Sequence, residues 1–166
     1  MNYIEVKITD IDDIEEMSEL ASKIVKEYYD PILGEKQNNY MIKKFQSVQG
    51  ITEQLKEGHN YYFVRNMDGL DVGFISFYPR NKDLYLSKFY LHKDHRGKGI
   101  SKDMHKFVIK KAKELGLASI ILNVNKYNEL AIAAYERLGF IKVDDEKNDI
   151  GNGYYMDDFV YKYSID

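Results

Sequence analysis

The segment Arg96-Gly97-Lys98-Gly99-Ile100-Ser101 separates an apolar strand pattern from an amphipathic helical pattern. A glycine-containing strand-to-helix turn exposes main-chain N–H groups at the start of a helix, where the helix dipole also favours an anion. Glycine permits unusual backbone angles and a close approach of a ligand. The segment therefore suits a phosphate or pyrophosphate, although its residues alone are equally compatible with a plain turn.

Two common nucleotide-binding patterns do not fit this segment. The dinucleotide fingerprint G-x-G-x-x-G requires glycine at position 102, where the chain has Lys102. The P-loop pattern G-x-x-x-x-G-K-[ST] is absent from the chain. A nucleotide-binding protein that uses the same loop in another way stays open as an alternative.

Hydrophobic periodicity predicts the elements on both sides of this segment. The expected strands cover about residues 4–8, 61–65, 72–78, 84–92, 119–124, 139–143 and 154–163. The expected helices cover about residues 11–25, 35–46, 48–57, 98–115 and 129–138. We expect Pro31 to follow the first helix as a break and Pro79 to stop the third strand, because proline lacks an N–H donor. Tight turns predict antiparallel pairs, and the strand–helix–strand unit around the segment predicts a parallel pair of the fourth and fifth strands.

The resulting prediction is an α/β fold with a mixed sheet, and residues 1–166 form a single domain because no linker or repeat is found. The net charge of −3 gives no general attraction to nucleic acid or to anionic lipid. The chain has no cysteine, which excludes disulfides and a cysteine nucleophile. Because neither a signal peptide nor a membrane-spanning run is found, we expect a cytoplasmic protein without a membrane partner. The 4 histidines show no metal-ligand spacing, so no metal is expected.

Two motifs resemble those of the GNAT superfamily of N-acetyltransferases. The segment is similar to motif A of that family, [QR]-x-x-G-x-[GA], with a serine at the last position, where glycine or alanine is usual. A later stretch is similar to motif B, N-x-x-A-x-x-x-Y-x-x-x-G-F. The matching positions are Arg96, Gly99 and Ser101 for motif A, and Asn128, Ala131, Tyr135, Gly139 and Phe140 for motif B. A weaker resemblance, through Tyr90, the loop and residues 156–158, points to small bacterial acetyltransferases of the PaiA or polyamine type.

This resemblance implies a GNAT-like fold of about seven strands, with helices on both faces and with the fourth and fifth strands splayed around acetyl-CoA. It implies that loop N–H groups hold the pyrophosphate and that the main chain of the fourth strand holds the pantetheine arm. The implied cofactor-binding residues are Phe89, Tyr90, Leu91, Arg96, Gly97, Lys98, Gly99, Ile100, Ser101, Asn125, Asn128 and Tyr135. Asn128 has a second expected role as the N-cap of the following helix.

The resemblance also implies direct transfer of an acetyl group to a primary amine, with Tyr135 as the acid that protonates the leaving thiolate. The proton acceptor for the amine stays open among Tyr85, Ser87 acting through water, and an acid such as Asp157. Asp157 and Asp158 must point to opposite faces of a strand, so at most one of them faces a given cleft.

The acceptor is the least defined part of this prediction. Acidic residues near the last strand favour a small cationic amine or a polyamine, and the resemblance places Tyr28, Tyr29 and Tyr40 near the acceptor. A sensor that binds a CoA compound without turnover is the main alternative function. The resemblance leaves a homodimer open.

Overall fold

The computed structural model describes residues 1–165. The chain divides into two compact units, and each is described here by itself. The first unit comprises Met1–Tyr78 and Lys88–Asp103, and the second comprises Pro79–Ser87 and the described chain from Met104 onward. The expectation of a single domain stays a prediction.

Seven strands follow the order β1-β2-β3-β4-β5-β7-β6. Their bounds are β1 Asn2–Glu5, β2 Asn60–Arg65, β3 Asp71–Arg80, β4 Asp83–Leu91, β5 Ser119–Asn125, β6 Ile141–Gly151 and β7 Tyr154–Ser164. β4 and β5 pair in parallel, whereas β1–β2, β2–β3, β5–β7 and β6–β7 pair antiparallel. This confirms the predicted mixed sheet and its parallel pair.

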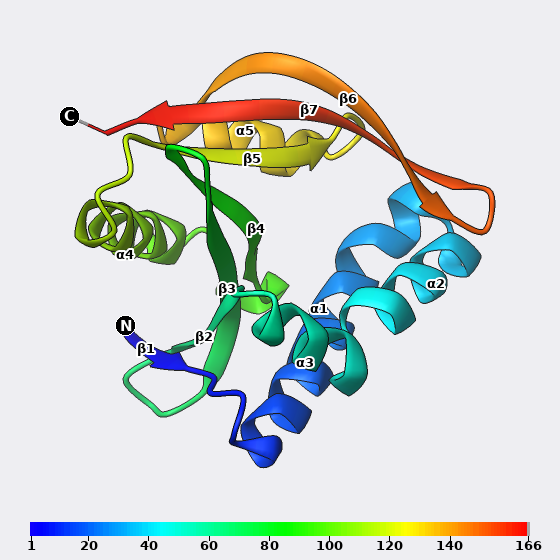
Figure 1. The fold of residues 1–166 in the computed structure, drawn as a ribbon, viewed down its shortest axis with the longest axis horizontal. Helices are drawn as coiled ribbons and strands as arrows, with labels where there is room; N and C mark the ends of the chain where they lie inside the picture. Colours follow the sequence, from blue (N-terminus) through cyan, green and yellow to red (C-terminus); the bar gives the residue numbers. More distant parts are fainter. Residues whose placement is uncertain (166) are drawn as a thin grey trace. The chain divides into compact units, whose positions relative to one another are not determined.

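In the first unit, three helices accompany the N-terminal strands (Figure 1). They are α1 Ile11–Leu33, α2 Glu35–Phe45 and α3 Val48–Lys56. Asp10 caps α1 by accepting a hydrogen bond from the N–H of Asp13. The apolar stripe of α1 packs on large side chains of β2 and β3, and this cluster is the core of the unit. Its buried members are Val6, Ile14, Met17, Ala21, Ile24, Val25, Ile51, Tyr61, Phe63 and Phe74.

Three predicted boundaries in this part of the chain are wrong. β1 ends at Glu5, and Ile8 is 44% exposed outside the strand. Pro31 lies inside α1, which continues to Leu33 because a proline in the last turn removes only one donor near a helix end. β3 passes through Pro79 to Arg80, at a strand end where a missing N–H costs little.

The second unit combines β5, β6, β7 and the start of β4 with two helices. α4 spans Ile100–Glu114, and its part from Met104 onward belongs to this unit, while α5 spans Glu129–Arg137. The β4–β5 register runs from Asp83–Ser119 to Tyr85–Ile121, whereas β4 continues to Leu91 and β5 to Asn125. β6 reaches Gly151, well beyond the predicted end near Val143. The additional residues pair with β7, but they are mostly polar and lack the apolar alternation from which a strand is predicted.

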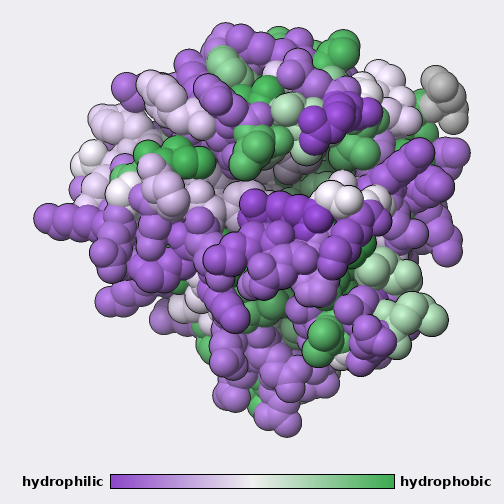
Figure 2. All heavy atoms as spheres, turned by 180° about the vertical axis from the view of Figure 1, so that it is seen from behind, coloured by the Kyte–Doolittle hydropathy of each residue, from purple (hydrophilic) through white to green (hydrophobic). Residues whose placement is uncertain are grey.

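The expected splaying of β4 and β5 around a cofactor, and the placement of helices on both faces, stay predictions. No helix within residues 1–165 is long and apolar enough to cross a membrane. The face drawn in Figure 2 is mostly hydrophilic, and its hydrophobic residues form small separate patches.

Candidate active site

The loop between β4 and α4 has the geometry that the sequence predicts for an anion site. A short 3-10 turn, Lys93–His95, precedes it, and α4 begins at Ile100. Gly97 and Gly99 have backbone φ values of +75° and +78°, a region that residues other than glycine rarely adopt. A Cβ built at either glycine would meet no heavy atom within 4 Å. The first N–H groups of α4 have no partner within the helix, so the loop presents open donors beside open space.

Arg96 at the start of this loop is held by α1. Its guanidinium carbon lies 4.0 Å from the ring centroid of Tyr28, and its Nε donates to the Leu91 carbonyl at 3.4 Å. The hydroxyl of Tyr28 donates to the same carbonyl at 3.4 Å. Burial raises the pKa of Tyr28, and the nearby Arg96 charge opposes that rise. Tyr28 therefore orders the loop, and its expected place near the acceptor stays a prediction.

The end of β4 lies in an aromatic cluster of the first unit. Tyr90 packs against Tyr28 and Tyr29 with ring centroids 5.3 and 6.3 Å away. A Cβ at Gly73 of β3 would come within 2.3 Å of the Tyr90 carbonyl oxygen, so only glycine fits beside β4 there. Phe89 is half-buried. Its expected main-chain contact with pantetheine stays a prediction.

In the second unit, Asn128 is the N-cap of α5. Its Oδ1 accepts from the Ala131 N–H at 3.2 Å, which confirms the predicted cap. The residue is 5% exposed, and its Nδ2 is buried with no hydrogen-bond partner among residues 1–165. A buried donor without a partner costs free energy unless a ligand satisfies it. The cap therefore leaves one side-chain donor of Asn128 available for the predicted contact with the cofactor.

Asn125 and Tyr135 lie on either side of this cap. Asn125 is buried and shapes the turn, since its Oδ1 accepts from the Tyr127 N–H at 2.9 Å. Tyr135 of α5 is half-buried, and its ring packs edge-on against Phe140 with centroids 5.6 Å apart. The loop belongs to the first unit, and Asn125, Asn128 and Tyr135 belong to the second. Their meeting in one site stays a prediction.

A polar hydrogen-bond array occupies one face of the strands in the second unit. Tyr85 of β4 donates to Asn123 Oδ1 of β5 at 3.0 Å. The Asn123 Nδ2 donates to Glu146 Oε2 at 2.9 Å and to Asp158 Oδ2 at 3.4 Å. We call these four residues, Tyr85, Asn123, Glu146 and Asp158, the Asn123 array.

The two adjacent aspartates of β7 have different environments, as their strand alternation predicts. Asp158 is 2% exposed, and burial, together with the nearby Glu146 carboxylate, raises its pKa from 3.8 to about 6. Asp157 is more exposed and forms an ion pair with Lys126, with 3.0 Å between Nζ and Oδ1. The buried acid is thus Asp158, whereas the sequence had suggested Asp157 as one of three candidate proton acceptors, with Tyr85 and Ser87.

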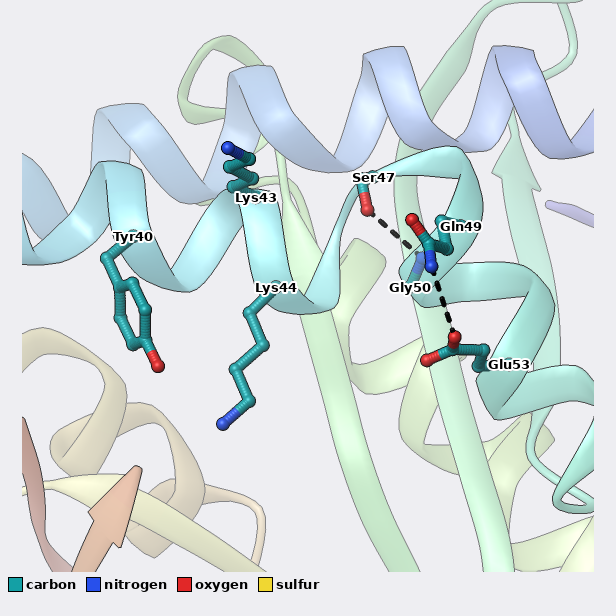
Figure 3. A pocket seen from close by; sticks show the side chains of 7 residues that line it. All are labelled: Tyr40, Lys43, Lys44, Ser47, Gln49, Gly50 and Glu53. Carbon is teal, nitrogen blue, oxygen red and sulfur yellow. Dashed lines mark hydrogen bonds between the residues drawn. The ribbon is translucent and has the colours of Figure 1, made fainter. Parts of the chain in front are cut away.

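A separate hollow of about 380 Å³ opens between α2 and α3 in the first unit (Figure 3). Its lining residues are Tyr40, Lys43, Lys44, Ser47, Gln49, Gly50 and Glu53. Tyr40 and Lys44 point to the same side of α2, and Lys43 points away from them (Figure 3). With two lysines and one glutamate, the hollow gives no excess negative charge for a cationic acceptor.

Sequence reasoning did not find the Asn123 array or the stacking of Tyr28 on Arg96. The signals for the array were Tyr85 and the pair Asp157-Asp158, because neither Asn123 nor Glu146 belongs to a motif. Among residues 1–165, no group of three or more histidine, cysteine, aspartate and glutamate side chains is arranged to hold a metal ion.

Comparisons with known proteins agree with this architecture. The model of the Acetyltransferase (GNAT) family matches residues 20–140. The chain is 28% identical over 111 residues to N-acetyltransferase family 8 member 2 of Rattus norvegicus, covering 63% of this chain and 49% of that protein. It is 26% identical over 104 residues to the uncharacterized N-acetyltransferase YdgE of Bacillus subtilis, covering 59% and 66%. The chain thus spans between about half and two thirds of the length of these relatives.

Solved structures share the fold over the whole chain. PaiA N-acetyltransferase from Thermoplasma acidophilum, solved in complex with coenzyme A, has a TM-score of 0.76 at 21% identity and 99% coverage of both chains. A GCN5-related N-acetyltransferase from Rhodopseudomonas palustris has a TM-score of 0.78 at 14% identity, with coverage of 99% and 95%. The family match covers most of the chain, and the strand order and parallel pair agree with it. This protein belongs to the Acetyltransferase (GNAT) family.

Proposed function

We propose that this protein is an acetyl-CoA-dependent N-acetyltransferase that moves an acetyl group to a primary amine by direct attack. The observation that carries the proposal is the loop at the start of α4, where two positive-φ glycines leave N–H donors beside open space. Such a helix N-terminus suits the pyrophosphate of a CoA compound. Family membership gives this anion site its most specific interpretation.

Side chains and main-chain groups of both units would bind the cosubstrate. Arg96 and Lys98 add positive charge at the loop, and Asn128 Nδ2 supplies the buried donor that has no protein partner. The main chain of Phe89 and Leu91 would pair with the pantetheine arm. Because the Leu91 carbonyl already accepts from Tyr28 and Arg96, we expect that residue to contribute mainly its N–H.

Tyr135 would protonate the leaving thiolate. Its ring packs against Phe140, and its hydroxyl is the proton donor in this proposal. We expect Tyr135→Phe to lower kcat about 10- to 100-fold, since general acid catalysis contributes on this scale or more. Binding of acetyl-CoA measured by calorimetry should change little. Unchanged turnover would remove Tyr135 from this role.

Only the charges of the two candidate regions restrict the class of acceptor amine. The hollow beside Tyr40 carries two lysines, whereas the Asn123 array carries two carboxylates that form no ion pair within residues 1–165. A small cationic amine, such as a polyamine, therefore fits the second unit better than the hollow. PaiA-like structural similarity is consistent with this acceptor class but concerns the fold alone.

Release of free thiol from acetyl-CoA tests the proposal directly. The protein is incubated with acetyl-CoA and a panel of spermidine, amino sugars, amino acids and peptide N-termini, with the protein-free mixture as control. Thiol release that depends on one acceptor class supports the transferase. Tight CoA binding without release on any acceptor would instead favour a CoA-binding sensor.

A further inference from the structure

The Asn123 array joins the last paired residue of β4 to a buried acid on β7. Tyr85 pairs with Ile121, the final pair of the parallel register, so the array begins where β4 stops pairing with β5. Cross-strand partners share a face of a sheet, and Asp158 is the partner of both Asn125 on β5 and Glu146 on β6. The array therefore runs across one face from β4 to β6.

Both amide hydrogens of Asn123 point to carboxylates, which fixes the orientation of its amide. One hydrogen goes to Glu146 and the other to Asp158, so the amide oxygen faces the hydroxyl of Tyr85. Two carboxylates that share one neutral donor are held close together without a cation between them. Such a pair retains a proton more readily than an isolated carboxylate does.

Neighbouring acids of the second unit have cationic partners, unlike Asp158 and Glu146. Lys126 lies 3.0 Å from Asp157 and 3.6 Å from Asp145, and Lys162 lies 3.9 Å from Asp83. Within residues 1–165, neither carboxylate of the Asn123 array forms an ion pair. Burial without an ion pair makes Asp158 the acid of this face that is best suited to take up a proton near neutral pH.

We propose that Asp158 is the proton acceptor for the amine that is acetylated, and that Asn123 and Glu146 position it. This inference rests on the proposed acetyl transfer. An ammonium group must lose one proton before its nitrogen can attack, and Asp158 takes that proton through one water molecule because its carboxylate is buried. The neutral amine then forms a C–N bond to the acetyl carbon, the C–S bond breaks, and the thiolate takes a proton from Tyr135. The nitrogen gives up its second proton as the amide forms, and that proton returns Tyr135 to its neutral form, while Asp158 releases its proton to solvent.

The charges around Asp158 determine the pH at which it can serve. Glu146 on β6 and Asp157 on β7 raise its pKa, Asn123 on β5 lowers it through a hydrogen bond, and Lys126 lowers it through its charge. Burial is the largest cause of the rise, to about 6. Below that pH the carboxylate is protonated and cannot accept the proton, so kcat/KM for an ammonium acceptor should fall on the acid side of about 6.

Two acceptors distinguish a proton acceptor from a merely structural acid. Spermidine carries ammonium groups near neutral pH, whereas hydroxylamine is largely neutral there and needs no proton acceptor before it attacks. We expect Asp158→Asn to lower kcat/KM for spermidine about 100-fold, the scale of general base catalysis, and to change the hydroxylamine rate much less. The acid limb near pH 6 in the spermidine profile should disappear in this variant.

Asp157→Asn is the matched comparison, because it makes the same change at the next residue, which points to the opposite face. It should keep an acid limb, displaced somewhat to lower pH because the Asp157 charge helps to raise the pKa of Asp158. Asp158→Glu, which keeps a carboxylate, should regain part of the rate with a shifted acid limb. Should Asp158→Asn fail to fold, as judged by acetyl-CoA binding and circular dichroism, the shifted limb of Asp158→Glu decides the matter.

The outcomes separate this inference from the proposed function. If the wild-type protein releases thiol with neither spermidine nor hydroxylamine, nor with any amine of the panel, the proposed function itself fails. If the wild type is active and Asp158→Asn lowers both acceptor rates equally while the acid limb persists, Asp158 is not the proton acceptor. Loss of the limb in Asp157→Asn instead would assign the role to Asp157.

Discussion

The loop from Arg96 to Ser101 and the Asn123 array present two different kinds of chemistry. The loop is largely exposed and acts through main-chain N–H groups, which the backbone angles of two glycines hold in place. The array is half-buried to buried and acts through side chains that four neighbouring strands bring together. A main-chain site depends on local conformation, whereas a side-chain site depends on strand register. The two regions should therefore respond differently to substitution, salt and pH.

Gly99→Val should produce the largest change in acetyl-CoA affinity, because valine disfavours the backbone conformation of the loop. A β-branched residue at φ +78° is strained, and relief of that strain would turn the N–H groups of the loop away from their present directions. With a strain of 1–3 kcal/mol, we expect acetyl-CoA affinity to fall by about 100-fold. Isothermal titration calorimetry measures this directly.

Gly69→Val is the control for this prediction. Gly69 has a similar φ of +80°, lies in the turn between β2 and β3, and also has open space around its Cβ position. Its substitution should cost stability without changing acetyl-CoA affinity. Equal loss of affinity in both variants would mean that Gly99 acts through the fold and not through the loop.

Asp158→Asn should make the protein more stable in mildly alkaline solution, by about 2 kcal/mol, because it removes a buried charge. The pKa of Asp158 is raised in the folded state from 3.8 to about 6, so the wild-type fold gains a proton before the unfolded chain does as the pH falls. Wild-type stability contributed by this group is fully present below pH 3.8 and is lost as the pH rises through about 6.

Urea unfolding of both proteins across this pH range measures the effect. The advantage of Asp158→Asn should shrink as the pH falls through about 6 towards 3.8. Asp157→Asn, which leaves the Asp158 carboxylate in place, supplies the comparison. A variant that is less stable than the wild type at every pH would show that the ionised carboxylate stabilises the Asn123 array.

Asn128→Asp should have the smallest effect on acetyl-CoA binding. Asn128 combines a contact to the main chain, the cap, with a side-chain donor. Aspartate still accepts from the Ala131 N–H and so retains the cap, but it lacks the buried Nδ2 donor. We expect about tenfold weaker acetyl-CoA binding, together with some loss of thermal stability, because a carboxylate oxygen is buried in the place of Nδ2. Asn128→Ala removes both functions and should also lower stability by about 1 kcal/mol.

Equal acetyl-CoA affinity in the wild type and Asn128→Asp would limit Asn128 to its role as a cap. Thermal unfolding and calorimetry on the same three proteins separate the two roles.

The sequence was informative wherever a function depends on local conformation. The glycine loop, the cap at Asn128 and most strands could be predicted, because turn residues and hydrophobic periodicity act over a few positions. Pro31 and Pro79 were misjudged, since a proline near the end of an element breaks only one hydrogen bond. The end of β6 was missed because that strand is exposed and has no apolar alternation.

The Asn123 array could not be predicted, because its residues come from four strands whose register the sequence does not specify. Asp157 and Asp158 were correctly expected to face opposite sides, but their order of burial depends on which strand lies beside β7. The stacking of Tyr28 on Arg96 was missed for a similar reason. This contact joins residues that are far apart in the sequence, and no motif relates them.

The position of Tyr28 beneath the guanidinium of Arg96 also gives the protein a usable optical property. The chain contains no tryptophan, so its ultraviolet emission comes from tyrosine alone. Tyr28→Trp would introduce the only indole of the chain, about 4 Å below a cation at the entrance of the loop, as the tyrosine ring now lies. Displacement of that guanidinium by an incoming anion would change the emission, so the occupancy of the loop could be followed in real time without a labelled ligand.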